Sequence, residues 1–364
     1  MSERIEWIDT AKVITMILVI IGHCNYYRIA TPFGGLYYIE KNSDVSFLYE
    51  CLSCLMSVIY SFHMPLFMSL SGMCYSLSKR SSDSINSLIR KKTFRLLIPF
   101  VVVTFFLSVP LKYVSGYWDN SQNIIIDVVC GQFLLMGNSH LWFIVSLFWI
   151  FLFFYYIEKK RLFDNKIWMS LIIISWIGLY IEPRCNFLGI PGAMKHLLFF
   201  SFGYHVVHLI DVYKDIKTKK LLLYLGIFIL FSGSNGILLR HYQEIALLKV
   251  VRPLLFIVFA ICGIVLFSLL SKKICSKSSA FFGGEILSFL KHNTYELYLY
   301  SDPFNYVIIN ICWIVFDGQI VVNNTLSLLV FFIRFIFTTF ISILIIKLVS
   351  SLRLKDAIRR FATK

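Results

Sequence analysis

Three ionisable residues lie along the first apolar stretch of the chain, which runs from Asp9 to His23. In a helix, Lys12 and His23 share nearly the same face and lie roughly 16 Å apart, about half the hydrocarbon thickness of a bilayer. Asp9 comes one turn before Lys12 on that face. Ionisable groups inside a membrane are costly unless they face protein or a wet cavity. The spacing therefore predicts a functional site with a charged mouth and a histidine deeper in the membrane.

A second histidine, His63, stands beside Pro65 in the next apolar run. Proline removes a backbone hydrogen bond, so we expect a kink at this point. The small residues Ser71 and Gly72 that follow allow close approach of another helix or of a ligand. A lone histidine on an apolar face is more often packed and hydrogen-bonded than catalytic. Its pairing with His23 on a neighbouring antiparallel span makes catalysis an equal alternative.

Two pairs of residues open later apolar runs. Lys92 and Arg95 stand one turn apart just before Pro99. A helix N-terminus with two cations can hold phosphates, although positive charge on cytoplasmic loops is the simpler explanation of the basic residues around them. His140 and Trp142 begin the fourth run, where each is either an interfacial residue or a substrate contact.

Acidic residues also occur within an apolar run near the end of the chain. Glu296 and Asp302 each need a partner there. Arg334, in the last run, is the candidate, and a structural ion pair is the expected use.

Composition predicts the fold class. The 364 residues are 58% hydrophobic and 15% charged, with a mean hydropathy of +0.75 and a net charge of +15. Basic residues concentrate in alternate short loops, which excludes a nucleic-acid-binding interpretation and places both termini in the cytoplasm. We predict an all-α, polytopic membrane bundle over 1–349 and a short basic cytoplasmic tail over 350–364. The expected spans number about ten, at about 10–31, 47–77, 94–113, 136–157, 167–182, 194–211, 221–239, 246–270, 294–316 and 326–348.

Four motifs resemble those of the membrane acyltransferases called acyltransferase type 3, above all the stand-alone sugar O-acetyltransferases of the fucose 4-O-acetylase kind. In chain order they are Lys12-x10-His23, Phe62-His63-Met64-Pro65-Leu66-Phe67 with Ser71-Gly72, Lys92-x-x-Arg95 before Pro99, and His140-Leu141-Trp142-Phe143. One departure concerns a late span, where the family commonly has Tyr-Leu-x-His-x-Pro and Ser301 stands in place of the histidine.

The resemblance implies transfer of an acyl group, usually acetyl from acetyl-CoA, to a hydroxyl of a glycan or its lipid-linked precursor in a bacterial cytoplasmic (inner) membrane. By the same resemblance, Lys92 and Arg95 would contact the CoA phosphates, and Ser71 and Gly72 would line the cavity. No metal is expected. A homo-oligomer is left open.

Acyl transfer to an alcohol needs a base for the hydroxyl proton and a group that stabilises the oxyanion. A neutral imidazole, with a pKa near ~6.5, suits the first task. We therefore predict His23 as general base, His63 as a second imidazole that orients it or stabilises charge, and Asp9 and Lys12 at the cytoplasmic mouth. His140 and Trp142 would bind substrate. An acyl-histidine on His23 stays an open variant.

A different class of function fits many of the same residues. Intramembrane His, Glu, Asp and Arg also suit a transporter or a flippase for a sugar-containing substrate. The lack of an internal repeat, and the cation pair where CoA would dock, favour the acyltransferase. A non-enzymatic scaffold has no sequence feature in its favour.

Overall fold

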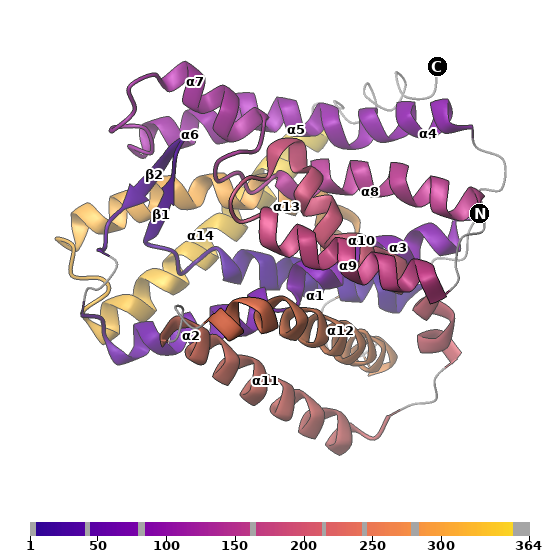
Figure 1. Cartoon of the computed structure of the whole chain (residues 1–364). Coiled ribbons are helices and arrows are strands. Elements are labelled where there is room, and N and C mark those ends of the chain that lie inside the picture. Colours follow the sequence, from indigo (N-terminus) through magenta and orange to yellow (C-terminus); the bar gives the residue numbers. More distant parts are fainter. Residues whose placement is uncertain are drawn as a thin grey trace.

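The computed structural model describes residues 5–40, 44–78, 84–160, 165–212, 216–241, 246–277 and 284–351, which form a helix bundle with one small hairpin (Figure 1). The helices are α1 (Glu6–Gly22), α2 (Phe47–Tyr60), α3 (His63–Leu77), α4 (Ile85–Lys92), α5 (Ile98–Val103), α6 (Val109–Val114), α7 (Ile124–Val128), α8 (Trp142–Lys159), α9 (Asn165–Ile181), α10 (Ile190–Val212), α11 (Thr218–His241), α12 (Ala246–Lys277), α13 (Gly284–Val315) and α14 (Asn324–Ser351). Short helical turns join some of them, namely η1 (Thr93–Leu97), η2 (Thr104–Ser108), η3 (Val129–Phe133) and η4 (Phe187–Gly189). The strands are β1 (Arg28–Thr31) and β2 (Gly34–Tyr37).

Five helical segments of the described chain are long and apolar enough to cross a membrane. They are Phe47–Leu77, Ile85–Val114, Trp142–Lys159, Val251–Cys275 and Asn324–Ser351. The all-helical membrane bundle is thus supported, while the number ten and the cytoplasmic termini stay predictions. Most of the expected tail over 350–364 lies outside the described residues.

The second predicted span is broken at the expected place. Helix α2 ends at Tyr60 and α3 begins at His63, with Phe62 in a non-helical conformation between them. Pro65, in the first turn of α3, has no N–H to donate to the carbonyl four residues earlier, which explains the break. The Phe62 ring fills the gap by stacking on Phe267 of α12, with centroids 4.3 Å apart. The break places His63 at a helix start inside the bundle.

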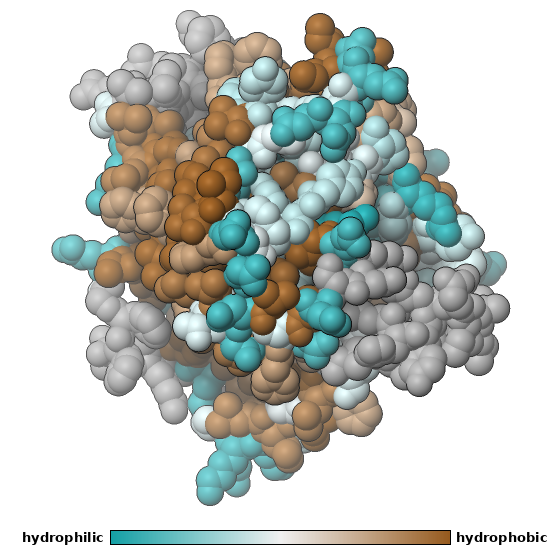
Figure 2. Space-filling model, turned by 90° about the vertical axis from the view of Figure 1, so that its left-hand side faces the viewer, coloured by the Kyte–Doolittle hydropathy of each residue, from teal (hydrophilic) through white to brown (hydrophobic). Residues whose placement is uncertain are grey.

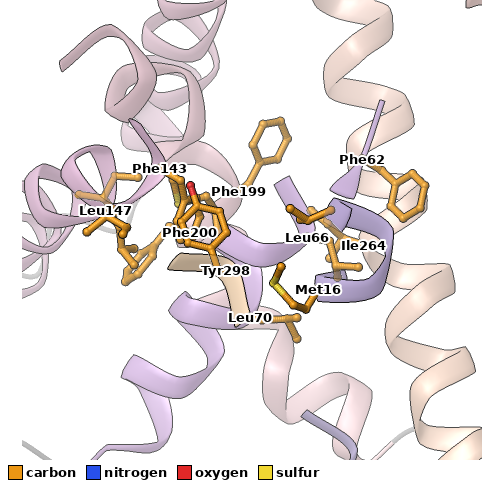
Figure 3. Packing of buried hydrophobic residues seen from close by; sticks show 14 of the residues in the cluster. Met16, Phe62, Leu66, Leu70, Phe143, Leu147, Phe199, Phe200, Ile264 and Tyr298 are labelled. Carbon is orange, nitrogen blue, oxygen red and sulfur yellow. The ribbon is translucent and has the colours of Figure 1, made fainter. Parts of the chain in front are cut away.

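Helix α1 runs through the middle of the bundle and packs against α2, α3, α12, α13 and α14. Figure 3 shows its Met16 beside Leu66 and Leu70 of α3 and Ile264 of α12, within the large apolar core. Because α1 is enclosed by other helices, the face that carries its ionisable residues meets protein rather than lipid.

Helices α3 and α10 cross in unusually close contact, and two glycines permit it. A Cβ on Gly72 would lie 2.1 Å from the carbonyl oxygen of Phe200, and one on Gly203 would lie 2.0 Å from that of Ser69. No side chain fits at either distance. Each helix therefore contributes the small residue that lets the other's backbone approach. This crossing sets the position of His63 relative to α10.

We expect Gly203→Ala to lower the stability of the protein by about 1–3 kcal/mol, because the new methyl forces α3 and α10 apart. Gly226→Ala, on α11, is the matched control, since nothing lies within 4 Å of a Cβ there. Thermal unfolding of the two purified variants in detergent checks the prediction. Equal midpoints for both variants would contradict it.

The hairpin covers one end of the bundle, next to α6 in Figure 1. Strands β1 and β2 pair antiparallel, and the Trp118 indole donates to the carbonyl of Phe33 in the turn (3.1 Å). Figure 2 looks onto this side: hydrophilic residues spread over its centre and upper right, and hydrophobic residues gather at the left. A mixed surface of this kind suits an end of the bundle better than a lipid-facing flank.

Candidate active site

A cavity of about 170 Å³ lies beside the break between α2 and α3, at the C-terminal end of α1. Four histidines line it: His23, His63, His140 and His196. They come from the end of α1, the start of α3, the segment before α8 and the first turns of α10. The structure thus brings together three histidines that the sequence singled out and one that it did not. The described residues contain no group of three or more His, Cys, Asp or Glu placed to hold a metal ion.

Three of the four imidazoles share one local arrangement. Nδ1 lies within hydrogen-bond distance of the carbonyl four residues earlier: 2.7 Å for His23 and Val19, 2.8 Å for His63 and Ile59, and 2.8 Å for His196 and Gly192. A carbonyl can only accept, so Nδ1 carries the hydrogen and Nε2 of the neutral ring keeps its lone pair. Within the described chain no hydrogen bond occupies these Nε2 atoms. Each ring therefore offers one proton acceptor.

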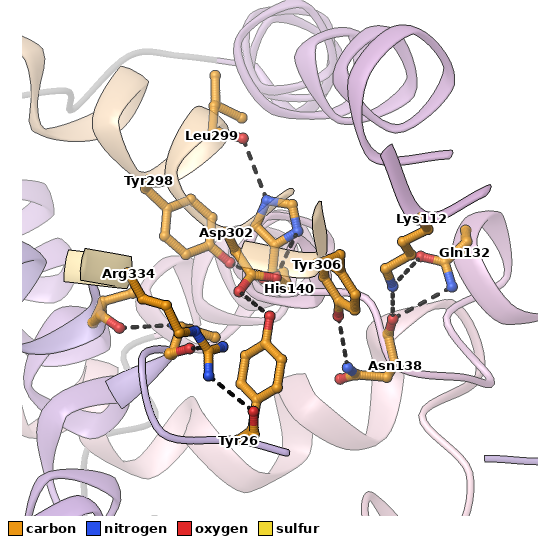
Figure 4. Close-up of polar contacts among 12 residues, drawn as sticks. Tyr26, Lys112, Gln132, Asn138, His140, Tyr298, Leu299, Asp302, Tyr306 and Arg334 are labelled. Atoms are coloured by element: carbon orange, nitrogen blue, oxygen red, sulfur yellow. Dashed lines mark hydrogen bonds and ion pairs between the residues drawn. The ribbon is translucent and has the colours of Figure 1, made fainter. Parts of the chain in front are cut away.

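His23 is also held through its backbone. The guanidinium of Arg334, which is fully buried, donates to the carbonyls of His23 (2.8 Å) and Tyr26 (2.9 Å) and to Oδ1 of Asn305 (3.1 Å). These bonds satisfy carbonyls that the end of α1 would otherwise leave without partners. Figure 4 shows Arg334 beside the Tyr26 ring. The imidazole is therefore fixed through both its ring and its main chain.

His140 has different surroundings, which Pro303 of α13 helps to create. Because Pro303 has no N–H, the carbonyl of Leu299 is free, and it lies 3.3 Å from Nε2 of His140. Nδ1 of the same ring lies 3.7 Å from Oδ2 of Asp302 (Figure 4). Both ring nitrogens thus face acceptors, and the N–H of the neutral ring can point to either of them. The expected ion pair of Asp302 with Arg334 is wrong, because Asp302 pairs with His140.

Lys112 is a second buried cation, which the sequence analysis did not single out. It lies close to the segment that carries His140. The ammonium of Lys112 donates to Oε1 of Gln132 (2.9 Å) and to the carbonyl of Asn138, and it lies 4.5 Å and 4.6 Å from the ring centroids of Tyr117 and Tyr306. Lys112 could have been noticed in the sequence as a single lysine inside an apolar span. The bonds hold the segment that leads to His140.

An ion pair completes the cavity on the side of α9 and α10. Nζ of Lys195 lies 3.1 Å from Oε2 of Glu182, and both side chains are partly exposed. The neighbouring His196 is 1% exposed and lies against the Trp142 ring, with centroids 5.3 Å apart. Trp142 therefore lines the cavity as expected for a substrate contact, whereas the other three residues were not singled out.

Asp9 and Lys12 lie at the opposite end of α1. Nζ of Lys12 is 3.1 Å from Oδ1 of Asp9, and Asp9 lines a second, more open pocket of about 320 Å³ together with Glu6, Lys291 and His292. The structure does not bring Asp9 and Lys12 into the histidine cavity. The predicted arrangement of a charged mouth at one end and a histidine at the other is present along α1.

Lys92 and Arg95 do not stand at a helix N-terminus, as the sequence had suggested. The helix begins at Ile85, where Ser84 caps it, and continues through both residues. The Lys92 ammonium lies 3.1 Å from the centroid of the Phe151 ring and is 8% exposed, whereas Arg95 is exposed. The expectation went wrong because the apolar run starts only at residue 94, while the helix includes the polar turns before it.

Ser71 and Gly72 do not line the histidine cavity. The Ser71 hydroxyl donates to the carbonyl of Phe67 (3.0 Å), and Gly72 packs on α10. Their contact with an acyl donor stays a prediction.

The comparison with protein families decides among the classes of function that this geometry allows. The sequence model of the acyltransferase domain, acyltransferase type 3, matches residues 5–347. The chain belongs to the acyltransferase type 3 family. The matched range includes both pockets and all the residues that the sequence singled out. A search of curated proteins found no significant match, and neither did a search of solved structures.

The histidine cavity at the end of α1 contains groups that suit acyl transfer. Acyl transfer needs a proton acceptor, and three of the four imidazoles have an Nε2 atom that can accept a proton. In this chain Ser301 (3% exposed) stands where the resemblance places a late-span histidine, and Asp302 follows it. The carboxylate next to Pro303 holds an imidazole from another segment instead.

Proposed function

We propose that this membrane acyltransferase moves an acetyl or similar acyl group from acetyl-CoA to a hydroxyl of a cell-surface polysaccharide or its lipid-linked precursor, in a bacterial cytoplasmic membrane. The observation that carries the proposal is the shared bonding of His23, His63 and His196, which leaves Nε2 of each free to accept a proton.

In the reaction, Nε2 of His23 accepts the proton of the acceptor hydroxyl as its oxygen attacks the thioester carbonyl. The carbon–sulfur bond then breaks, and the CoA sulfur leaves with the proton that the imidazolium returns. His23 suits this role better than His63 because its ring is partly accessible, whereas His63 is 1% exposed. His63, which directly follows the non-helical residue Phe62, orients the reacting groups.

The negative charge of the tetrahedral intermediate needs a stabilising group nearby. The ring of His140, which lines the cavity and is held between Asp302 and the Leu299 carbonyl, is the candidate. Asp302 acts here as a positioning residue.

The donor enters from the Asp9 and Lys12 end of α1, and the acceptor meets it at the His23 end. The distance between them suits a long, flexible thioester arm. Arg95 is the better candidate for the CoA phosphates, because it is exposed and the Lys92 ammonium already lies on an aromatic ring.

Transfer of label from [acetyl-¹⁴C]acetyl-CoA tests the proposal. We expect the purified chain to place base-labile label on surface polysaccharide that was first freed of esters with mild alkali. Boiled protein is the control. Absence of label, together with movement of a lipid-linked sugar across the membrane of reconstituted vesicles, would instead support a flippase.

A further inference from the structure

One wall of the cavity is formed by residues at the end of α9 and in the first turns of α10, and the proton transfer from the acceptor to His23 does not use them. We propose that Glu182, Lys195 and His196 form the subsite that binds the acceptor, a neutral polyhydroxylated sugar ring, beside the reacting hydroxyl. This inference rests on the proposed acyl transfer and specifies its acceptor class.

The three side chains offer the polar atoms that a ring with several hydroxyls needs. Nε2 of His196 can only accept, because Nδ1 donates to Gly192 (2.8 Å). The Glu182 carboxylate accepts and the Lys195 ammonium donates, and each side chain of this pair keeps 17–18% of its surface exposed. Trp142 adds an aromatic face next to His196. Donor, acceptors and an apolar face thus meet on one wall.

The wall is preorganised by bonds that involve no ligand. The Ser175 hydroxyl of α9 donates to the carbonyl of Lys195 (2.8 Å), and a Cβ on Gly178 would lie 2.3 Å from the Lys195 nitrogen, so α9 and α10 pack closely at this point. Oδ1 of Asn186 accepts from the backbone nitrogen of Gly192 (2.9 Å), which anchors the first turn of α10. A rigid wall of this kind binds a ligand without the cost of ordering side chains.

Charge balance selects a neutral ring over an acidic one. Among the described residues that line the cavity, Glu182 and Lys195 carry opposite charges that cancel, and the imidazoles are neutral when a ring nitrogen accepts. A carboxylate on the sugar would therefore be a buried charge without a partner.

Two substitutions of His196 separate ligand binding from structural and catalytic roles. In His196→Asn the amide can still donate to the Gly192 carbonyl, but no side-chain atom occupies the position of Nε2. In His196→Gln the longer amide reaches that place without supplying a base. Glu182→Gln with Lys195→Met removes both charges together and leaves neither of them unpaired. His208→Asn, exposed on the same helix, is the control.

The full chain in detergent is assayed with [acetyl-¹⁴C]acetyl-CoA and ester-free surface polysaccharide. We expect His196→Asn and the double variant to raise the half-saturating polysaccharide concentration about tenfold, as loss of one hydrogen bond predicts, with the acetyl-CoA value unchanged. His196→Gln should stay within about threefold of the wild type. Free glucose or galactose should inhibit the wild type more strongly than glucuronate.

The outcomes separate the subsite from the proposed function. Transfer by the wild type with an unchanged half-saturating polysaccharide concentration in His196→Asn overturns the subsite alone. Equal loss of kcat in both His196 variants, without a change in that concentration, assigns His196 to proton transfer and overturns the binding role. Stronger inhibition by glucuronate overturns the neutral class. A wild type that transfers no label overturns the proposed function, and the subsite with it.

Discussion

Substitution of His23 by asparagine should lower kcat for acyl transfer by about 10²- to 10⁴-fold, the range that a general base contributes. The asparagine amide can still donate to the Val19 carbonyl, and Arg334 still holds the backbone carbonyl of residue 23. What the variant lacks is the proton acceptor at the place of Nε2. The local structure should therefore persist while the chemistry stops.

The measurement is label transfer from acetyl-CoA at saturating acceptor, normalised to folded protein. His208→Asn is the control, because that histidine is exposed and lines neither pocket. Near-wild-type kcat in His23→Asn, with normal thermal stability, would remove His23 from the reaction. Incubation with the donor alone distinguishes the two mechanisms: label on the wild-type chain that is absent from His23→Asn indicates an acyl-histidine.

Substitution of Arg334 by lysine should cost about 3 kcal/mol or more of stability. Arg334 places three donors on three acceptors at 2.8–3.1 Å, and a lysine ammonium cannot match the planar fork. Two acceptors in the bundle interior would then lack partners, at about 1–3 kcal/mol each. Because one of them is the carbonyl of His23, activity should fall with stability.

Thermal unfolding in detergent checks this expectation. Arg184→Lys is the matched control, since that guanidinium is exposed and donates only to the carbonyl of Tyr180 among the described residues. An Arg334→Lys protein with the midpoint of the control would show that the three bonds contribute little.

Features that depend on neighbouring residues in the chain could be predicted from the sequence. The helical repeat places Asp9, Lys12 and His23 along α1, and the missing N–H of Pro65 breaks the helix before His63. Both effects act within a turn or two of helix, so the local sequence contains the cause. The membrane character can be predicted from composition for a similar reason. Each apolar helix has to be surrounded by lipid or by other apolar side chains, whatever the rest of the fold.

The partners of the polar residues were decided by tertiary structure. His140 meets an α13 carbonyl 159 residues later in the chain, and Arg334 caps a helix 311 residues earlier. Arg334 was the candidate partner of Asp302 in the sequence, and only the packing of α13 shows that Asp302 faces His140. Lys195 and His196 interrupt an apolar run, and only the packing of α9 and α10 places them at the cavity.

The sequence by itself determined that the chain is a helical membrane protein with a histidine at the end of its first helix, because helix periodicity and the cost of burying charge act locally. Only the tertiary structure decided which histidines meet and which ring nitrogens remain free. Those contacts depend on helix crossings such as that of α3 and α10 at Gly72 and Gly203. One added methyl group there would increase the distance between the two helices.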